Sequence, residues 1–284
     1  MTDQPVLVVD GLRMPEGFRW HDDFLYFVDM QAGELLRSTG AGAPEVVASL
    51  DGHLGGMGWL SNGDLIVVEM GDRHILRVGP DGSTSLYSDV SHLTPWQIND
   101  LTVDPAADRA YVGTFGFDAL GGAERQPGEI YCIEPDGTAR VVASDLQMAN
   151  KSHILADGRT LIVGETWGEA ITAFDIAENG DLVNRRPWAS VPSMVPDGSA
   201  LDVEGGLWVA NLLASEFIRV VEGGEITDRI PAGEGNISLE CALGGPDGTT
   251  LFLGTATSWD PEVTARRLGM IRSVQVEVPG LARV

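Results

Sequence analysis

Six positions of the sequence recur at one place in a repeated pattern, and five of them carry side-chain oxygen atoms. Each lies about ten residues before the anchor of an apolar run. In chain order they are Glu16, Gly56, Asn99, Asn150, Asp197 and Glu240. Carboxylate and amide oxygens are hard donors that suit Ca²⁺, and less often Mg²⁺ or Mn²⁺. Zn²⁺ is less favoured because no His or Cys occupies the set.

The apolar runs that must position these side chains form six copies of one pattern. Each copy has a turn rich in Asp, Asn or Gly and then a β run, as in "SNGDLIVVE" and "EGGLWVAN". The runs are anchored near Leu25, Leu65, Ala110, Leu161, Leu207 and Leu251. Their spacing of about 40 to 50 residues is the period of β-propeller blades.

The remaining runs complete the blades. Each copy continues with a third β run, and five copies add a fourth, whereas the sixth has none before the chain ends. The opening stretch "QPVLVVDGL" supplies one instead. We therefore expect an all-β fold, with residues 1–284 forming a single six-bladed β-propeller of four-stranded antiparallel blades, closed in the last blade by the N-terminal strand. Ring symmetry then brings the six equivalent positions, five of which carry side-chain oxygens, together at one mouth of the central channel.

The composition excludes several classes of partner. The formal net charge is -24 and the isoelectric point is about 4.3, so a nucleic acid would be repelled. No apolar stretch is long enough to predict a membrane span, and no signal peptide is visible. Cys132 and Cys241 have no disulfide or metal spacing and are expected to be buried thiols. These features favour a cytoplasmic protein that acts on a small molecule.

Nucleophilic and nicotinamide chemistry are poorly supported. Ser199 lies in "DGSAL", which lacks the second glycine of the G-x-S-x-G elbow. Neither H-E-x-x-H nor a G-x-G-x-x-G after a strand is present.

The motifs "MPEGFRW", "IND", "MANKSHILADGRTLIV" and "VPDGSALDVEGGLWVAN" resemble the senescence marker protein 30/gluconolactonase/luciferin-regenerating enzyme family, over nearly the whole chain. The resemblance implies a six-bladed propeller with one divalent cation in its channel, and lactone hydrolysis as the activity of many members. It implies Glu16, Asn150 and Asp197 as metal ligands, with Asn99 near both metal and substrate. Asp197 matches the metal-bound Asp that is often cast as the base.

Three positions depart from the family pattern. Gln97 stands where sugar-lactonase members carry Arg, Lys151 and His153 follow the second Asn in place of the usual Gly, and Glu240 replaces a small or neutral residue. These departures bear on the substrate rather than on the fold or the cation.

The expected mechanism is cation-assisted hydrolysis of a cyclic ester. The cation would polarise the carbonyl group and acidify a bound water, and Asp197 would accept the proton. Glu240 is a second acid/base candidate, or else a solvated loop carboxylate. His153 and Lys151 are expected mainly to serve structure, although Lys151 could pair with Glu240 or with a substrate oxygen. Phosphotriester hydrolysis at the same cation site and a non-catalytic binding propeller remain alternatives.

Aromatic residues near the channel mouth indicate the substrate. The expected contacts are Trp96, Phe115, Phe117, Trp167 and Trp259, several of them on long loops that are often lids or binding loops. At least two of these rings are expected to pack between blades. Together with the neutral amide of Gln97 they favour an ester or lactone less polar than an aldonolactone.

Overall fold

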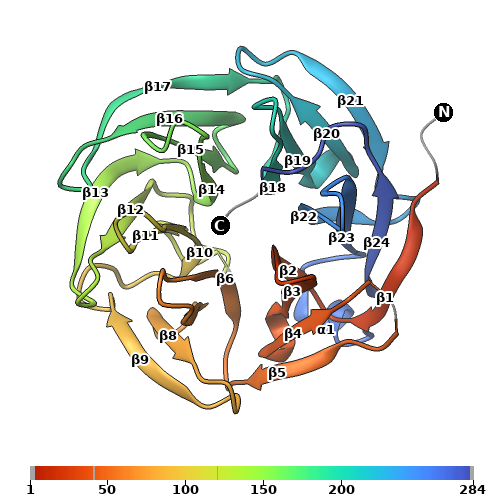
Figure 1. Cartoon of the computed structure of the whole chain (residues 1–284), viewed down its shortest axis with the longest axis horizontal. Coiled ribbons are helices and arrows are strands. Elements are labelled where there is room, and N and C mark those ends of the chain that lie inside the picture. The colour runs from red at the N-terminus through yellow and green to blue at the C-terminus, as the bar shows by residue number, and fades with distance from the viewer. Residues whose placement is uncertain (1–3, 41, 120, 282–284) are drawn as a thin grey trace.

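Six four-stranded antiparallel sheets surround a central channel in the computed structural model, which describes residues 4–40, 42–119 and 121–281 (Figure 1). The prediction of a six-bladed β-propeller is therefore confirmed. Each of blades 1 to 5 uses four consecutive strands, the first innermost and the fourth outermost.

The strand bounds follow the repeats of the sequence. Blade 1 contains β2 (Pro15–His21), β3 (Phe24–Asp29), β4 (Glu34–Ser38) and β5 (Glu45–Ser49). Blade 2 contains β6 (Leu54–Trp59), β7 (Leu65–Glu69), β8 (His74–Val78) and β9 (Thr84–Asp89). Blade 3 contains β10 (Ile98–Asp104), β11 (Arg109–Thr114), β12 (Gly128–Ile133) and β13 (Ala139–Leu146). Blade 4 contains β14 (Ala149–Ile154), β15 (Thr160–Glu165), β16 (Ala170–Ile176) and β17 (Leu182–Ser190). Blade 5 contains β18 (Pro196–Leu201), β19 (Leu207–Asn211), β20 (Glu216–Val220) and β21 (Ile226–Pro231).

The sixth blade closes the ring with the N-terminal strand, as predicted. It combines β22 (Ile237–Gly244), β23 (Thr250–Ala256) and β24 (Gly269–Gln275) with β1 (Val6–Leu12) as its outer strand. Val9 and Leu12 of β1 are buried in one cluster with Phe252 and Ile271 of the same blade. The two ends of the propeller are thereby joined by backbone hydrogen bonds and by apolar packing.

Burial explains why the second strand of each blade reads as a nearly continuous apolar run. Strand β7 ("LIVVE") and strand β15 ("TLIVGE") are buried at every position, since a blade lies against each of their faces. The outer strand β5 ("EVVAS") has only one buried residue. The predicted thiols, Cys132 and Cys241, are both free and buried.

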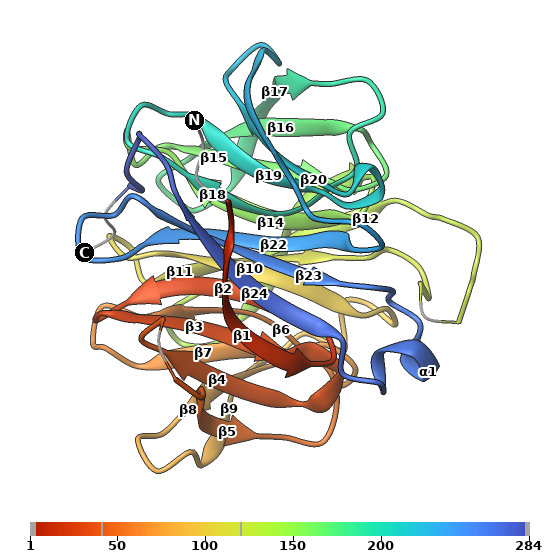
Figure 2. The same ribbon diagram turned by 90° about the vertical axis from the view of Figure 1, so that its right-hand side faces the viewer.

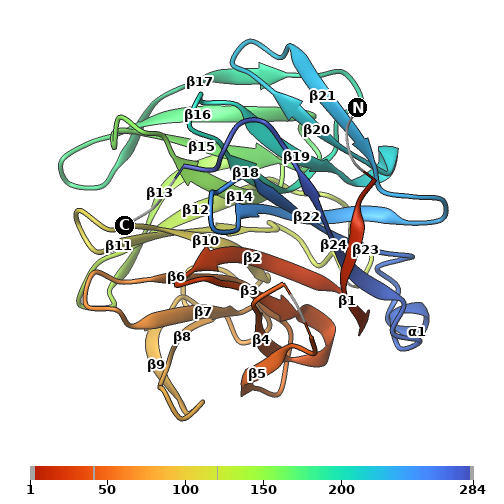
Figure 3. The same ribbon diagram turned by 45° about the vertical axis from the view of Figure 1, so that its right-hand side comes forward.

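The connections between second and third strands gather at one mouth of the channel. They include the short helices η1 (Met30–Ala32), η2 (Leu212–Ala214) and α1 (Pro261–Thr264), and the loop of residues 115–127. Figure 2 shows α1 and the β11–β12 loop projecting on the same side of the disc, and Figure 3 shows the same arrangement from an oblique angle. Among the described residues, no helix has the length and apolarity to cross a membrane.

Candidate active site and cation centre

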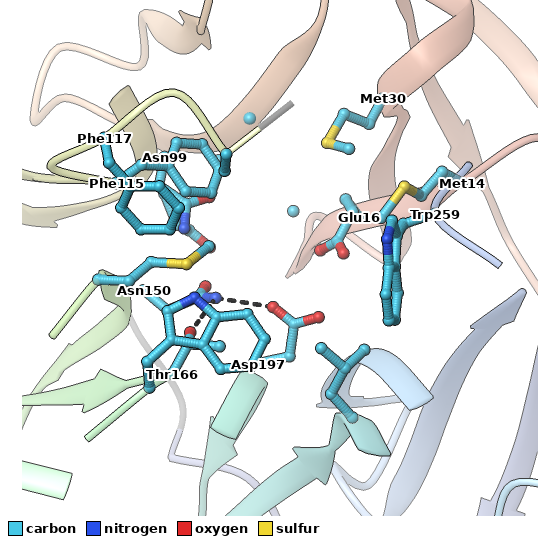
Figure 4. Close-up of a pocket in the computed structure, with 18 of the residues that line it drawn as sticks. Met14, Glu16, Met30, Asn99, Phe115, Phe117, Asn150, Thr166, Asp197 and Trp259 are labelled. Carbon is cyan, nitrogen blue, oxygen red and sulfur yellow. Dashed lines mark hydrogen bonds between the residues drawn. The ribbon is translucent and has the colours of Figure 1, made fainter. Parts of the chain in front are cut away.

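A cavity of about 360 Å³ opens at this mouth and reaches the innermost strands (Figure 4). Its base is polar and its walls are largely aromatic and sulfur-containing. Polar lining residues are Glu16, Gln31, Asn99, Asp100, Arg125, Asn150, Thr166 and Asp197, and the larger apolar ones are Met14, Met30, Phe115, Phe117, Met148, Trp167, Leu212 and Trp259.

Four of the six predicted ring positions lie at one level of the channel. In blades 1 to 5, the residues paired with the last residue of the second strand are Pro15, Leu54, Ile98, Ala149 and Pro196. A β-bulge follows, directly in blades 2 to 5 and after Glu16 in blade 1. Ser238 precedes the same bulge in blade 6. The next residues are therefore equivalent, and they are Glu16, Gly55, Asn99, Asn150, Asp197 and Leu239.

The predicted equivalence is thus correct for four blades and wrong by one residue for Gly56 and Glu240. Both belong to the following level, together with Asp100 and Lys151. All six innermost strands carry such a bulge, so the difference comes from the turns between the first and second strands. These turns differ in length, as the closing pairs His21 with Phe24 and Trp59 with Leu65 show, so a fixed count back from the second strand can miss by one residue.

Hydrogen bonds orient the amide of Asn150. Its Nδ2 donates to Asp197 Oδ1 at 2.7 Å and to Thr166 Oγ1 at 3.0 Å, and its Oδ1 accepts from the Lys151 backbone N–H at 2.8 Å. Figure 4 shows the carboxylates of Glu16, from blade 1, and Asp197, from blade 5, directed into the cavity. Asn99 also faces this space, and its buried Nδ2 has no hydrogen-bond partner among the described residues.

Burial and neighbouring negative charges disfavour the ionised form of both carboxylates. Burial raises the pKa of Asp197 to about 7, opposed by the hydrogen bond from Asn150 and reinforced by the charges of Glu240 and Asp100. Burial and the neighbouring charge of Asp197 raise the pKa of Glu16 well above its ordinary value. Both side chains are half-buried because they face the cavity, so water within it moderates these shifts.

The residues present fit a divalent cation. The innermost strands bring together the carboxylates of Glu16, Asp100, Asp197 and Glu240 with the cations Arg19 and Lys151. Apart from Arg125 on its loop, this group carries two negative charges in excess when ionised. One divalent cation would balance that excess. The available ligands are carboxylate and amide oxygens. At the same level, no hydrogen bond from Nδ2 to a described residue fixes the Asn99 amide, so its oxygen can turn towards a cation.

The level below contains a buried ionic layer. Lys151 Nζ donates to Glu240 Oε2 at 2.8 Å and to the Phe18 carbonyl at 3.0 Å, with the two charged side chains 3% and 1% exposed. Arg19 Nη2 contacts Asp100 Oδ1 at 2.6 Å. A β-carbon on Gly198 would lie 1.9 Å from Glu240 Oε1, so this glycine makes room for the carboxylate.

The predicted substrate contacts divide into two groups. Phe115, Phe117 and Trp167 line the cavity, and so does Trp259. Trp96 and Gln97 lie outside the lining, and the Gln97 carbonyl accepts a hydrogen bond from the Phe115 backbone N–H at 3.1 Å. Gln97 therefore bonds the backbone of the lining residue Phe115 and does not itself line the cavity.

Sequence reasoning missed several residues of the cavity. Three methionines, Met14, Met30 and Met148, and the guanidinium of Arg125 contribute to the lining. Met14 directly precedes β2 and Met148 directly precedes β14, so their place at the strand entries was the available signal. Arg125 lies in an aperiodic loop, where no pattern indicates which side chains face the channel.

Two other polar groups lie outside the cavity. His153 Nε2 is 2.9 Å from Ser199 Oγ, and both residues are buried. Glu69, Asp72 and His74 bring potential ligand atoms within 4.8 Å of one another at the β7–β8 turn. The Glu69 carboxylate accepts the backbone N–H groups of Gly71 and Asp72, which accounts for its position as a turn cap.

Comparisons with known proteins agree with the architecture. Regucalcin of Macaca fascicularis is 26% identical over 66% of this chain, which spans 64% of that relative's length. The 6-deoxy-6-sulfogluconolactonase of Pseudomonas putida is 24% identical over 92% of this chain and 90% of its own. A solved luciferin-regenerating enzyme superposes with a TM-score of 0.84 at 21% identity, covering 99% and 98% of the two chains. The model of the SMP-30/gluconolactonase/LRE-like region matches residues 14–257, and the chain belongs to this family.

Proposed function

We propose that this protein is a divalent-cation-dependent hydrolase that opens a lactone ring. The observation that carries the proposal is the layer of Glu16, Asn99, Asn150 and Asp197 at the base of a cavity with apolar walls. The Pseudomonas putida relative is named as a lactonase, which supports the same reaction class here.

The layer supplies the ligands of the cation. Glu16 and Asp197 provide charge, and Asn99 and Asn150 provide neutral oxygens that leave the cation's charge partly uncompensated. Ca²⁺ suits this all-oxygen set best, with Mg²⁺, Mn²⁺ and Zn²⁺ as further candidates. When bound, a divalent cation supplies Lewis-acid polarisation of a carbonyl group.

Proton transfer falls to Asp197. Without a cation, burial raises the pKa of Asp197 to about 7. A bound cation would lower this pKa and keep the carboxylate ionised, ready to accept a proton near neutral pH. The hydrogen bond from Asn150 Nδ2 fixes one carboxylate oxygen, so the other remains available to an attacking water. Glu240, the second predicted acid/base residue, is bonded to Lys151 and lies outside the cavity lining, and we assign it no proton transfer.

The walls favour a lactone less polar than a sugar lactone. Phe115, Phe117 and Trp167 present ring surface, and apolar contact of a fully covered side chain is worth about 1.5–3 kcal/mol. A dense array of hydroxyl groups would lose its hydration against such walls without finding partners.

The test combines cation removal with two isosteric variants. Asp197→Asn and Glu16→Gln are expected to lower kcat/KM for a lactone by at least about a hundredfold, because each removes a charge from the layer. Calorimetric Ca²⁺ titration should show weakened binding, and circular dichroism should show an unchanged fold. Glu222→Gln, at an exposed position, is the matched control.

The substrate panel separates the alternatives. It contains gluconolactone, alkyl- and aryl-substituted lactones of equal ring size and a phosphotriester, each assayed with and without chelator. Full activity in either variant would contradict the site assignment. Preference for the phosphotriester would replace the lactonase proposal, and a protein without bound cation or chelator-sensitive turnover would be a binding propeller. A preference for gluconolactone would refute only the apolar substrate.

A further inference from the structure

Arg125 is the only cation among the described residues that line the cavity. It comes from the loop between β11 and β12, and its Cζ lies 3.7 Å from the centroid of the Trp167 ring. No hydrogen bond or ion pair joins its side chain to another described residue. A guanidinium placed at a site and left without an anion has its charge available to a ligand.

The contact with Trp167 leaves the hydrogen-bonding edge of Arg125 free. A guanidinium that lies against an aromatic ring uses its flat face for the cation–π interaction. Its N–H groups lie in the plane of the guanidinium, where they can donate in parallel to the two oxygens of a carboxylate. Stacking also restricts the side chain, so less conformational entropy is lost when a ligand binds.

Two further donors of the same cavity lack partners. Trp167 Nε1 and Asn99 Nδ2 are buried and bonded to no described residue. Such a buried donor costs about 1–3 kcal/mol unless something satisfies it. The unsatisfied groups of the cavity are thus donors, which calls for a ligand with acceptor oxygens.

The charges of the cavity are separated between its base and its mouth. Glu16 and Asp197 enter from the innermost strands, whereas Arg125 enters from a second-to-third-strand loop. A cation at the base would neutralise the two carboxylates, and Arg125 would then be the uncompensated charge of the lining. A substrate that fills both ends carries its ester at the base and a negative charge at the mouth.

We propose that the substrate is a lactone bearing one oxyanion, a carboxylate or a sulfonate, which Arg125 binds against Trp167. This inference rests on the proposed function and names the substrate class of the same site. It also reconciles apolar walls with a charged residue: the ring and carbon skeleton contact Phe115 and Phe117, and one anionic group contacts Arg125.

The experiment compares acidic and neutral ligands of one shape. The lactones are 5-oxotetrahydrofuran-2-carboxylate, its carboxamide, the homologue with one more methylene before the carboxylate, and the corresponding sulfonate. Their unreactive lactam counterparts, 5-oxoproline and its amide, measure binding alone by calorimetry of the Ca²⁺-loaded protein. The variants are Arg125→Gln and Arg125→Lys, and Arg159→Gln is the matched control because it removes the same charge at an exposed turn of the opposite mouth.

Native protein should bind 5-oxoproline at least about tenfold more tightly than its amide, and the preference should weaken with added salt. Arg125→Gln should abolish the preference in binding and in kcat/KM, Arg125→Lys should keep part of it, and Arg159→Gln should keep it all. The carboxylate and sulfonate arms identify the oxyanion. If neutral lactones are hydrolysed as well as the acidic ones, the inference of an anionic substrate is wrong and the proposed lactonase function stands. Selective binding without hydrolysis of any lactone instead contradicts the proposed function.

Discussion

Lys151 is the residue whose environment differs most from that of an ordinary surface cation. It is buried in the channel between Glu240 and the Phe18 carbonyl, and its own backbone N–H holds Asn150 Oδ1. Burial raises the pKa of Glu240, and the Lys151 charge opposes that rise. The pair therefore supports the cation layer from below, both by bonding and by cancelling a charge that would otherwise repel Glu16 and Asp197.

Removing one partner of this pair should be costly, and removing both should cost less. Lys151→Met leaves a buried carboxylate without its ion pair, and the free energy of unfolding is expected to fall by about 3–5 kcal/mol. In Lys151→Met combined with Glu240→Gln the stranded charge is gone, so the double variant should be more stable than Lys151→Met alone. Urea unfolding in the presence of a chelator measures both. Strictly additive effects of the two substitutions would contradict the coupling.

At the scale of elements, the propeller separates cation binding from substrate binding. The innermost strands β2, β10, β14 and β18 carry the predicted ligands, and the loops between second and third strands carry most of the aromatic wall. A change in a loop should therefore alter substrate affinity and leave cation affinity nearly unchanged.

Trp259→Ala tests this separation. The ring is half exposed on the β23–β24 segment and lines the cavity, so its removal costs the fold little. The KM for an alkyl-substituted lactone should rise about tenfold, equivalent to about 1.4 kcal/mol of lost contact, while the Kd for Ca²⁺ stays within about twofold. Leu213→Ala, an exposed loop residue outside the cavity lining, is the control. Equal loss of cation affinity would show that the loop also shapes the cation layer.

The elements also show what the sequence could and could not predict. The turn-and-strand repeat determined all six blades and the closing role of β1, because burial on both faces leaves a readable apolar run. It also predicted the four positions Glu16, Asn99, Asn150 and Asp197, which share one level. It assigned Glu240 to the level of the four ligands although this residue lies one position further along β22, because a fixed count across the turn to β23 ignores the length of that turn. Arg125 was missed because its position depends on the path of a loop.

At the scale of the whole molecule, the buried carboxylates of the channel make stability depend on pH and on the cation. The folded-state pKa of Asp197 is raised from 3.8 to about 7, and that of Glu16 is raised as well. The folded protein therefore binds protons more tightly than the unfolded chain does. The stability contribution of these groups is complete below pH about 4 and is lost as the pH rises towards 7.

In the presence of a chelator, the free energy of unfolding should accordingly fall between pH 4 and pH 7 through these two groups. Ca²⁺ at a hundred times its Kd should restore about 2.7 kcal/mol, and the restoration should grow with pH because the cation competes with protons for the same carboxylates. Thermal unfolding at several pH values, with Ca²⁺ or chelator, measures both trends. In Asp197→Asn, both the fall of stability with pH and the pH-dependent effect of Ca²⁺ should be weaker. An unchanged pH profile in that variant would show that other groups cause the dependence.

Lys151 has one more consequence, because it is the single lysine of the sequence and every other basic side chain besides the histidines is an arginine. With its side chain 3% exposed, the ε-amino group is shielded from amine-selective reagents as long as the propeller is closed. Modification of this one side chain then adds one mass increment, beyond any on the α-amino group, for each molecule that has opened. The chain thus contains its own covalent reporter of global unfolding, readable by intact-protein mass spectrometry without any introduced label site.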